Sequence, residues 1–206
     1  MPYVGLVLAY LLGSVPAAYI AGRVVKGIDL RQHGSGNLGA TNVYRVLGAK
    51  VAVVVLLFDA FKGAIPVHYF PPWLVPNATP DHALEWAIAY GVAAIAGHVR
   101  PIFLLWKGGG KGVATAAGVF TALAPLPMLI TLVVFALIVM VSGYVSLGSL
   151  IAAALLPIIL AIFRGVHSPL LVLAIVIALF VLWTHRANIR RLRRGEEHRF
   201  GRNKAT

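Results

Sequence analysis

The first group of residues suited to chemistry lies in a polar segment, residues 31–48. The chain as a whole is 60% hydrophobic. Glycines recur along this segment, and a glycine lets a main-chain N–H approach an anion closely because it has no Cβ. Hydroxyl and amide side chains can hydrogen-bond a phosphate or a polyol, and an arginine can grip a phosphate through two parallel bonds. The alternative is an ordinary polar connection in which Thr41 or Asn42 caps a helix. The density of polar groups favours a binding loop whose candidate residues are Ser35, Asn37, Thr41, Asn42 and Arg45.

A second polar segment contains six consecutive residues directly before an apolar stretch: Lys107, Gly108, Gly109, Gly110, Lys111 and Gly112. Glycine N–H groups, two ammonium groups and a following helix N-terminus can all face one anion. A nucleotide-hydrolysing P-loop is excluded, because that motif needs Ser or Thr after its lysine and Gly112 stands there. A flexible interfacial loop is the alternative. The run predicts an anion-binding loop.

The third segment begins where the last apolar stretch ends. His185 and Asn188 are three residues apart, so one helix face would carry both, and they could jointly touch a ligand. The arginine-rich run 190–194 is typical of a stop-transfer signal and a lipid-headgroup anchor. Ser142 flanks a short predicted turn and is a weaker candidate.

Two ionisable residues fall inside an apolar stretch. Asp59 and Lys62 share a helix face and can pair, which lowers the cost of burying each charge. Ionisable residues within a membrane span are functional candidates, and a structural ion pair is the alternative. The sequence has no cysteine, no H-E-x-x-H motif and no cluster of carboxylates. It therefore predicts neither a metal site nor acid–base catalysis by paired carboxylates.

The elements that must position these residues are transmembrane helices. The chain has 206 residues, a mean hydropathy of +0.87 and only 12% charged residues, whereas soluble domains carry about 25%. A net charge of +12 could indicate a nucleic-acid partner. Here the basic residues cluster between apolar stretches, as cytoplasmic loops of membrane proteins do. The first stretch lacks the basic start and small-residue cleavage site of a signal peptide.

We predict an all-α, polytopic membrane protein that forms one integral membrane domain over residues 1–206, with a basic cytoplasmic tail from about residue 186. Six spans are the alternative to seven, if a single helix continues through the prolines at 125 and 127. The predicted spans are Pro2–Gly22, Val51–Phe70, Leu84–His98, Val113–Leu123, Pro125–Val141, Leu147–Phe163 and Leu170–His185.

The basic residues predict the orientation of the spans. With seven spans and the N-terminus outside, 16 of the 18 Lys and Arg residues fall on the cytoplasmic side. Only Arg164 lies outside, and Lys62 lies within a span. Basic loops stay in the cytoplasm. Six spans would put the basic tail opposite the first basic loop, so the charge pattern favours seven.

The three polar segments together resemble the bacterial acyl-phosphate:glycerol-3-phosphate acyltransferase family, in order and over essentially the whole chain. The chain departs from the family pattern in the glycine run, where one glycine fewer is usual, and after Phe200. The motifs that carry the resemblance are Gly34–Asn42 with Arg45, Gly97-His98 through Gly112, Asp59 with Lys62-Gly63, and His185–Leu192 with Gly195-Glu196.

The resemblance implies that acyl phosphate donates its acyl group to the 1-hydroxyl of glycerol 3-phosphate. The product is lysophosphatidic acid, which begins phospholipid synthesis. It further implies a multi-pass enzyme of the bacterial cytoplasmic (inner) membrane that works as a monomer, faces the cytoplasm, contacts membrane lipids, binds no nucleic acid and needs no cofactor. The alternative is a transporter of a phosphorylated solute, but the polar residues gather on one side and no repeated halves are visible.

The resemblance, together with the residue types, assigns the site. Glycerol 3-phosphate is expected at Ser35, Asn37, Thr41, Asn42, Arg45 and Lys107. Acyl phosphate is expected at Gly108, Gly109, Gly110, Lys111 and Gly112. His185, Asn188 and Ser142 are the catalytic candidates, while Asp59, Lys62 and His98 are expected to support the site. A phosphate oxygen of a substrate can take the hydroxyl proton, with His185 as the alternative base, and the division of roles between Lys107 and Lys111 stays open.

Overall fold

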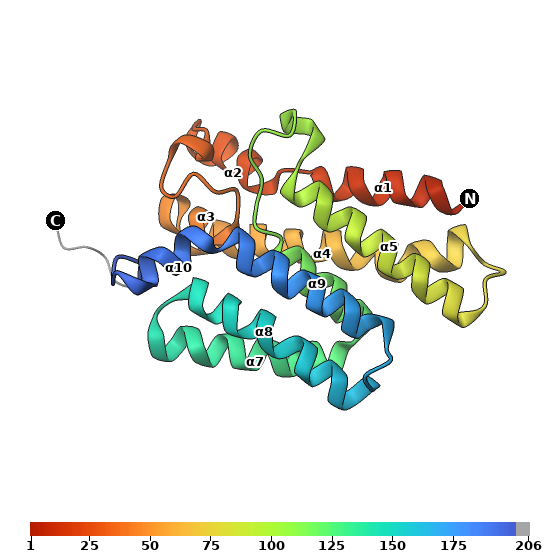
Figure 1. Cartoon of the computed structure of the whole chain (residues 1–206). Coiled ribbons are helices and arrows are strands. Elements are labelled where there is room, and N and C mark those ends of the chain that lie inside the picture. The colour runs from red at the N-terminus through yellow and green to blue at the C-terminus, as the bar shows by residue number, and fades with distance from the viewer. Residues whose placement is uncertain (201–206) are drawn as a thin grey trace. The chain divides into compact units, whose positions relative to one another are not determined.

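The computed structural model describes residues 1–200, which contain helices and no strand (Figure 1). The all-α prediction is therefore confirmed for this part of the chain. The tail residues Arg202 and Lys204 lie outside the described residues. The chain divides into two compact units, Met1–Leu123 and Ala124–Thr206. The prediction of one integral domain over 1–206 stays a prediction.

The first unit is a bundle in which α1 packs on α5 and α4 packs on both α5 and α6. Glycines allow these helices to touch main chain to main chain: a Cβ on Gly13 would overlap the carbonyl oxygen of Ala94, and one on Gly63 would overlap that of Thr115. Small residues permit such close approach in lipid. The helices are α1 (Pro2–Ser14), α2 (Ala17–Lys26), α3 (Ala40–Leu47), α4 (Ala49–Leu74), α5 (Pro80–Val99) and α6 (Val113–Leu123).

The second unit contains a helical hairpin and two further helices. α7 (Pro125–Ser142) packs on α8 (Val145–Arg164), and α8 packs on α9 (Pro169–Thr184). The last helix, α10 (Arg186–Arg193), contacts both α8 and α9. It turns away from α9 by 59°.

Within residues 1–200, five helical segments are long and apolar enough to cross a membrane. They are Pro2–Lys26, Ala49–Leu74, Pro80–Leu104, Pro125–Ser142 and Val145–Arg164, and α9 with α10 makes a sixth if the bent pair counts as one span. The predicted segment Val113–Leu123 is a helix with the predicted ends, but its 11 residues extend about 16 Å, which is short of a bilayer core of about 30 Å. The lengths and composition of these helices fit a multi-pass membrane protein, while the seventh span stays a prediction.

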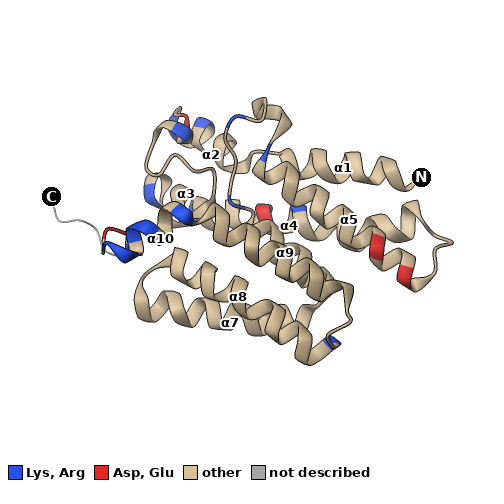
Figure 2. Ribbon diagram, viewed as in Figure 1, with Lys and Arg blue, Asp and Glu red and all other residues tan. Residues whose placement is uncertain are grey.

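Charged residues are segregated within each unit (Figure 2). In the first unit, Lys and Arg gather at the end that holds α2 and α3, whereas acidic residues mark the start of α5 at the other end. In the second unit, the arginines of α10 lie at one end and Arg164 lies at the far end of α8. Within each unit the basic end is therefore the end that carries the polar segments.

Candidate functional site

The first polar loop is built around Asn42, which is buried. Its Nδ2 donates to the carbonyl oxygens of His33 (3.0 Å) and Leu30 (3.3 Å), and its Oδ1 accepts from the N–H of Ser35 (2.8 Å). Gly39, not Thr41 or Asn42, is the N-cap of α3, so the helix-cap alternative is wrong. The buried side chains of Leu30 and Leu38 anchor the loop in the core formed with α3 and α4. The Asn42 amide therefore holds the loop in shape through hydrogen bonds to the loop's own main chain.

The other candidates of the first loop lie around this frame. Ser35 is exposed. Thr41 and Arg45 are both half-buried and lie one turn apart on α3, on the same helix face. Asn37 extends toward the second loop, where its Nδ2 donates to the carbonyl oxygen of Gly109 (3.3 Å). The loop and α3 thus carry Ser35, Thr41 and Arg45 around a backbone that Asn42 holds in place.

Asp29 and Arg31 brace the two loops, a role that the sequence interpretation missed. The guanidinium of Arg31 grips Asp29 through Nε (3.0 Å to Oδ1) and Nη2 (2.6 Å to Oδ2), and Nη1 donates to the carbonyl oxygen of Lys107 (3.0 Å). Hydrogen bonds from Arg31, together with its charge and that of Arg23, lower the pKa of Asp29 to about 2 against the opposing effect of burial. An acid two residues before a basic residue is the signal that could have suggested this brace.

The glycine loop lies against the end of α5 and against the first loop. The N–H of Gly110 donates to the carbonyl oxygen of His98 (3.2 Å), and the N–H of Leu38 donates to that of Gly109 (3.3 Å). The N–H groups of Gly108, Gly109 and Gly112 make no hydrogen bond within residues 1–200. Gly108 has a φ of 88°, a conformation that favours glycine. These N–H groups are suited to an anion that binds from outside the chain.

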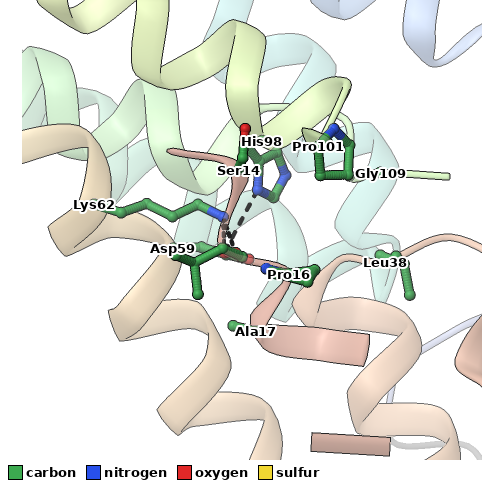
Figure 3. Close-up of a pocket in the computed structure, with 11 residues that line it drawn as sticks. Ser14, Pro16, Ala17, Leu38, Asp59, Lys62, His98, Pro101 and Gly109 are labelled. Carbon is green, nitrogen blue, oxygen red and sulfur yellow. Dashed lines mark hydrogen bonds and ion pairs between the residues drawn. The ribbon is translucent and has the colours of Figure 1, made fainter. Parts of the chain in front are cut away.

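Three buried ionisable side chains lie beside the loop in a small pocket (Figure 3). Asp59 Oδ1 lies 2.8 Å from Lys62 Nζ and 3.4 Å from His98 Nδ1. Lys62 Nζ also donates to the carbonyl oxygen of Val15 (3.0 Å) between α1 and α2. Ser14, Leu38, Gly109 and Gly110 line the same pocket. The predicted pair of Asp59 and Lys62 is therefore present, and the predicted supporting residue His98 joins it.

In the second unit, the buried carboxylate of Glu197 organises the third polar segment. Its Oε1 accepts from Asn188 Nδ2 (2.7 Å) and Ser146 Oγ (3.0 Å), and its Oε2 accepts from Arg191 Nε (2.7 Å). Burial alone would raise the pKa of Glu197, but these hydrogen bonds and the charge of Arg191 outweigh it and lower the pKa. The sequence interpretation missed Glu197, because one of two adjacent glutamates in a tail carries no pattern of its own.

The two remaining candidates are placed at helix ends. His185 lies between α9 and α10, is buried, and has its Nδ1 2.9 Å from the carbonyl oxygen of Val181. Ser142 donates through Oγ to the carbonyl oxygen of Ile138 (2.6 Å) and accepts from the N–H of Tyr144 (3.1 Å), so its hydroxyl serves the turn after α7. The catalytic role of Ser142 stays a prediction. A different serine, Ser146, donates to Glu197, which also accepts from Asn188.

The predicted residues and those that the sequence interpretation missed thus form two groups. The first unit brings together the first loop, the glycine loop and the Asp59, Lys62 and His98 cluster, and the second unit brings together Asn188, Ser146 and Glu197. Residues 1–200 contain no group of three His, Asp or Glu side chains placed to hold a metal ion. The first group can bind anions through its main-chain N–H groups and its cationic side chains.

The chain is similar to known proteins over nearly its whole length. A family model described as glycerol-3-phosphate acyltransferase matches residues 3–195. Proteins of that name from Trichlorobacter lovleyi and Geobacter sulfurreducens are 50% and 49% identical, each over 193 residues that cover 93% of this chain and 94% of the relative.

Solved structures agree with the sequence relatives. The crystal structure of PlsY, an integral membrane glycerol 3-phosphate acyltransferase, in its glycerol 3-phosphate form is 38% identical, with a TM-score of 0.84 over 97% of this chain and 96% of that chain. Its lysophosphatidic acid form gives a TM-score of 0.82 over 97% and 95%. Because the family model spans residues 3–195, a relative of 50% identity covers 93% of the chain and the fold matches a solved structure, the chain belongs to the glycerol-3-phosphate acyltransferase family.

Proposed function

We propose that this protein transfers a fatty acyl group from acyl phosphate to the 1-hydroxyl of glycerol 3-phosphate and releases lysophosphatidic acid. The observation that carries the proposal is the junction of two anion-binding loops, where the N–H of Leu38 and the amide of Asn37 both donate to Gly109. Two phosphate-bearing substrates need two such loops next to each other. The relatives' names and the solved forms with glycerol 3-phosphate and with lysophosphatidic acid support the acceptor and the product.

Each loop would hold one phosphate. In the first loop, Ser35, Asn37 and Thr41 would contact the glycerol hydroxyls, and Arg45 the phosphate, while the buried Asn42 holds the loop in shape. In the glycine loop, the unbonded N–H groups and Lys111 would hold the phosphate of the acyl donor. Lys107 is exposed at the start of the glycine loop, and Arg31 fixes its carbonyl, so it would lie between the two phosphates.

The reaction needs little from a protein base. The 1-hydroxyl oxygen attacks the acyl carbon, the bond from that carbon to the phosphate oxygen breaks, and the phosphate leaves with the electron pair. The hydroxyl proton moves to a phosphate oxygen, with His185 as the alternative acceptor and Asn188 and Ser142 as further catalytic candidates. Preorganised N–H groups stabilise the charge that grows on the leaving phosphate, and holding both substrates removes much of the entropic barrier.

The test is an assay in detergent, where no sealed compartment exists and transport cannot be scored. Purified protein with acyl phosphate and glycerol 3-phosphate should give lysophosphatidic acid and inorganic phosphate in equal amounts. Acyl-CoA should not replace acyl phosphate at comparable concentration. No product from acyl phosphate, or equal use of acyl-CoA, would refute the proposal.

We further propose the location and orientation of the enzyme. The basic residues support seven spans with the N-terminus outside, a cytoplasmic active site and a bacterial inner-membrane location, with α6 as a short span. We propose a monomer that binds both substrates and membrane lipids and does not bind nucleic acid.

Single cysteines in this cysteine-free chain test the orientation. An impermeant thiol reagent should label only an outer position in intact cells, and cytoplasmic positions only after lysis. Labelling of a cytoplasmic position in intact cells would contradict the map. The outer position is Asn77, and the cytoplasmic positions are Ser35, Lys107 and Arg193, all of which are exposed.

A further inference from the structure

The cluster of Asp59, Lys62 and His98 joins four parts of the first unit. Asp59 and Lys62 lie on α4, His98 lies at the end of α5, Lys62 reaches the carbonyl of Val15 between α1 and α2, and the pocket includes the glycine loop (Figure 3). All three side chains are buried. An ion pair in such a place is costly unless each member has several partners. The arrangement therefore ties these elements together through buried polar contacts.

The two nitrogens of the His98 ring face different neighbours. Nδ1 lies 3.4 Å from the carboxylate of Asp59. The carboxylate thus faces this side of the ring, and Lys62 Nζ lies 2.8 Å from the same oxygen. The opposite nitrogen, Nε2, is the nearest atom to the site where a Cβ on Gly110 would stand, and the two would overlap. The imidazole therefore packs directly against the main chain of the glycine loop.

The glycine loop packs tightly against the end of α5. A Cβ on Gly109 would overlap the carbonyl oxygen of Val99, and the N–H of Gly110 donates to the carbonyl of His98 (3.2 Å). The loop thus lies on the end of α5, with the imidazole as its support. A shift of the ring would act directly on Gly110, which is bonded to Gly109 in the main chain.

We propose that His98 is a positioning residue for the acyl transfer, held by Asp59 and acting through Gly110 to set where the glycine loop presents its N–H groups. This proposal rests on the proposed function, because it assigns to the loop the task of holding the donor phosphate. It adds a chain of contacts that runs from Asp59 through the imidazole to Gly110. Lys62 completes this chain by neutralising Asp59 and tying it to Val15.

Kinetics of paired variants test the proposal. His98→Asn keeps an amide near the position of Nδ1 and removes the part of the ring that reaches Gly110, and Gly110→Ala disturbs the same contact from the other side. Each should lower kcat/KM, by about 10²-fold for a shift of about 1 Å. Residues that act through one contact are not additive, so the double variant should lose no more than the worse single variant. His98→Gln, whose amide reaches toward the position of Nε2, should restore part of the loss.

Tyr90→Phe is the matched control on the same helix. It removes a hydroxyl in the middle of α5 that donates to the carbonyl of Pro2 (3.2 Å). It should lower the unfolding temperature and leave kcat/KM unchanged. If the losses of His98→Asn and Gly110→Ala multiply in the double variant, or if His98→Asn behaves like Tyr90→Phe, His98 is only structural and the proposal is overturned.

A readout that does not depend on activity separates this inference from the proposed function. Ser14 is fully buried, its hydroxyl makes no hydrogen bond within the described part of the chain, and it lines the pocket beside the glycine loop. Ser14→Cys in the cysteine-free chain should resist a maleimide reagent. The added change His98→Asn should make that cysteine react at least about tenfold faster, because a displaced loop uncovers the pocket. Equal labelling rates would refute the positioning role even in an active enzyme. An inactive wild type with the expected labelling would refute the proposed function alone.

Discussion

Replacing Glu197 by Gln should destabilise the second unit, because the change alters the buried group that receives three hydrogen bonds. In the variant, an NH2 group replaces one carboxylate oxygen. Arg191 loses its charged acceptor whichever way the amide points. In addition, either Arg191 faces the NH2 group or Asn188 and Ser146 lose the oxygen that they share. One hydrogen bond to a charged group contributes about 1.5–3 kcal/mol. We expect a loss of about 2 kcal/mol, which lowers the unfolding temperature by roughly 4–8 °C in a chain of this size.

The adjacent Glu196→Gln is the matched control. Glu196 is exposed, so its replacement should change stability by no more than about 0.5 kcal/mol. Thermal unfolding in detergent compares the two variants, with acyl transfer measured at a temperature where both are folded. Glu197→Gln should also slow turnover, because Asn188 loses its fixed orientation. Equal unfolding temperatures for the two variants would refute the role given to Glu197.

The same carboxylate predicts a pH dependence. The pKa of Glu197 is lowered in the folded protein from its ordinary value of 4.5. The folded state therefore binds this proton less tightly than the unfolded state, and the stabilisation is fully present above the unfolded pKa. It is lost as the pH falls through the folded pKa. Wild type should lose stability below about pH 4.5 more steeply than Glu197→Gln, in which this titration is absent.

Three further changes test the first unit. Arg31→Lys removes the planar fork that joins Asp29 to the carbonyl of Lys107, and we expect kcat/KM to fall by about tenfold or more while overall helix content by circular dichroism stays unchanged. Arg45→Ala should raise KM for glycerol 3-phosphate far more than KM for acyl phosphate, and equal changes in steady-state assays would contradict its assignment. Gly110→Val should lower turnover by about 10²–10³ or more, because the side chain displaces the loop. Near-normal lysophosphatidic acid synthesis in this variant would show that the glycine loop only connects α5 to α6.

The helices of this fold could largely be predicted from sequence, because hydropathy and punctuating residues define them. Val113–Leu123 and the start at Pro125 match the structure. The helix α3 was missed inside the first polar segment, since its 8 residues are too few for a clear period and are half polar. The break at residues 15–16 in the first span was also missed. Pro16 is the local signal there, because the residue before a proline disfavours helical geometry.

The segments that form the candidate site could be predicted from the sequence, but the direction in which each side chain points could not. Asn42 and Asn37 look alike in sequence, yet one bonds its own loop and the other bonds Gly109. An amide donates and accepts equally well toward main chain or ligand, so composition cannot decide between them. His98 was expected to support the site, but its contact with Gly110 depends on how α5 meets the loop, which no local pattern encodes.

The placement of the acidic residues fits the proposed binding of phosphates at this site. Asp29, Asp59 and Glu197 are buried, and each lies against Arg31, Lys62 or Arg191. Each carboxylate therefore neutralises a cation that holds a loop in place. Asp81 and Glu85 lie at the start of α5, the opposite end of the first unit from its polar loops. A phosphate bound as proposed at the first unit's loops would meet Arg45, Lys107, Lys111 and glycine N–H groups, with no unpaired carboxylate beside them in that unit's described residues. Because acids serve as internal braces, the loops can be rigid and still carry the positive charge that two phosphate-bearing substrates require.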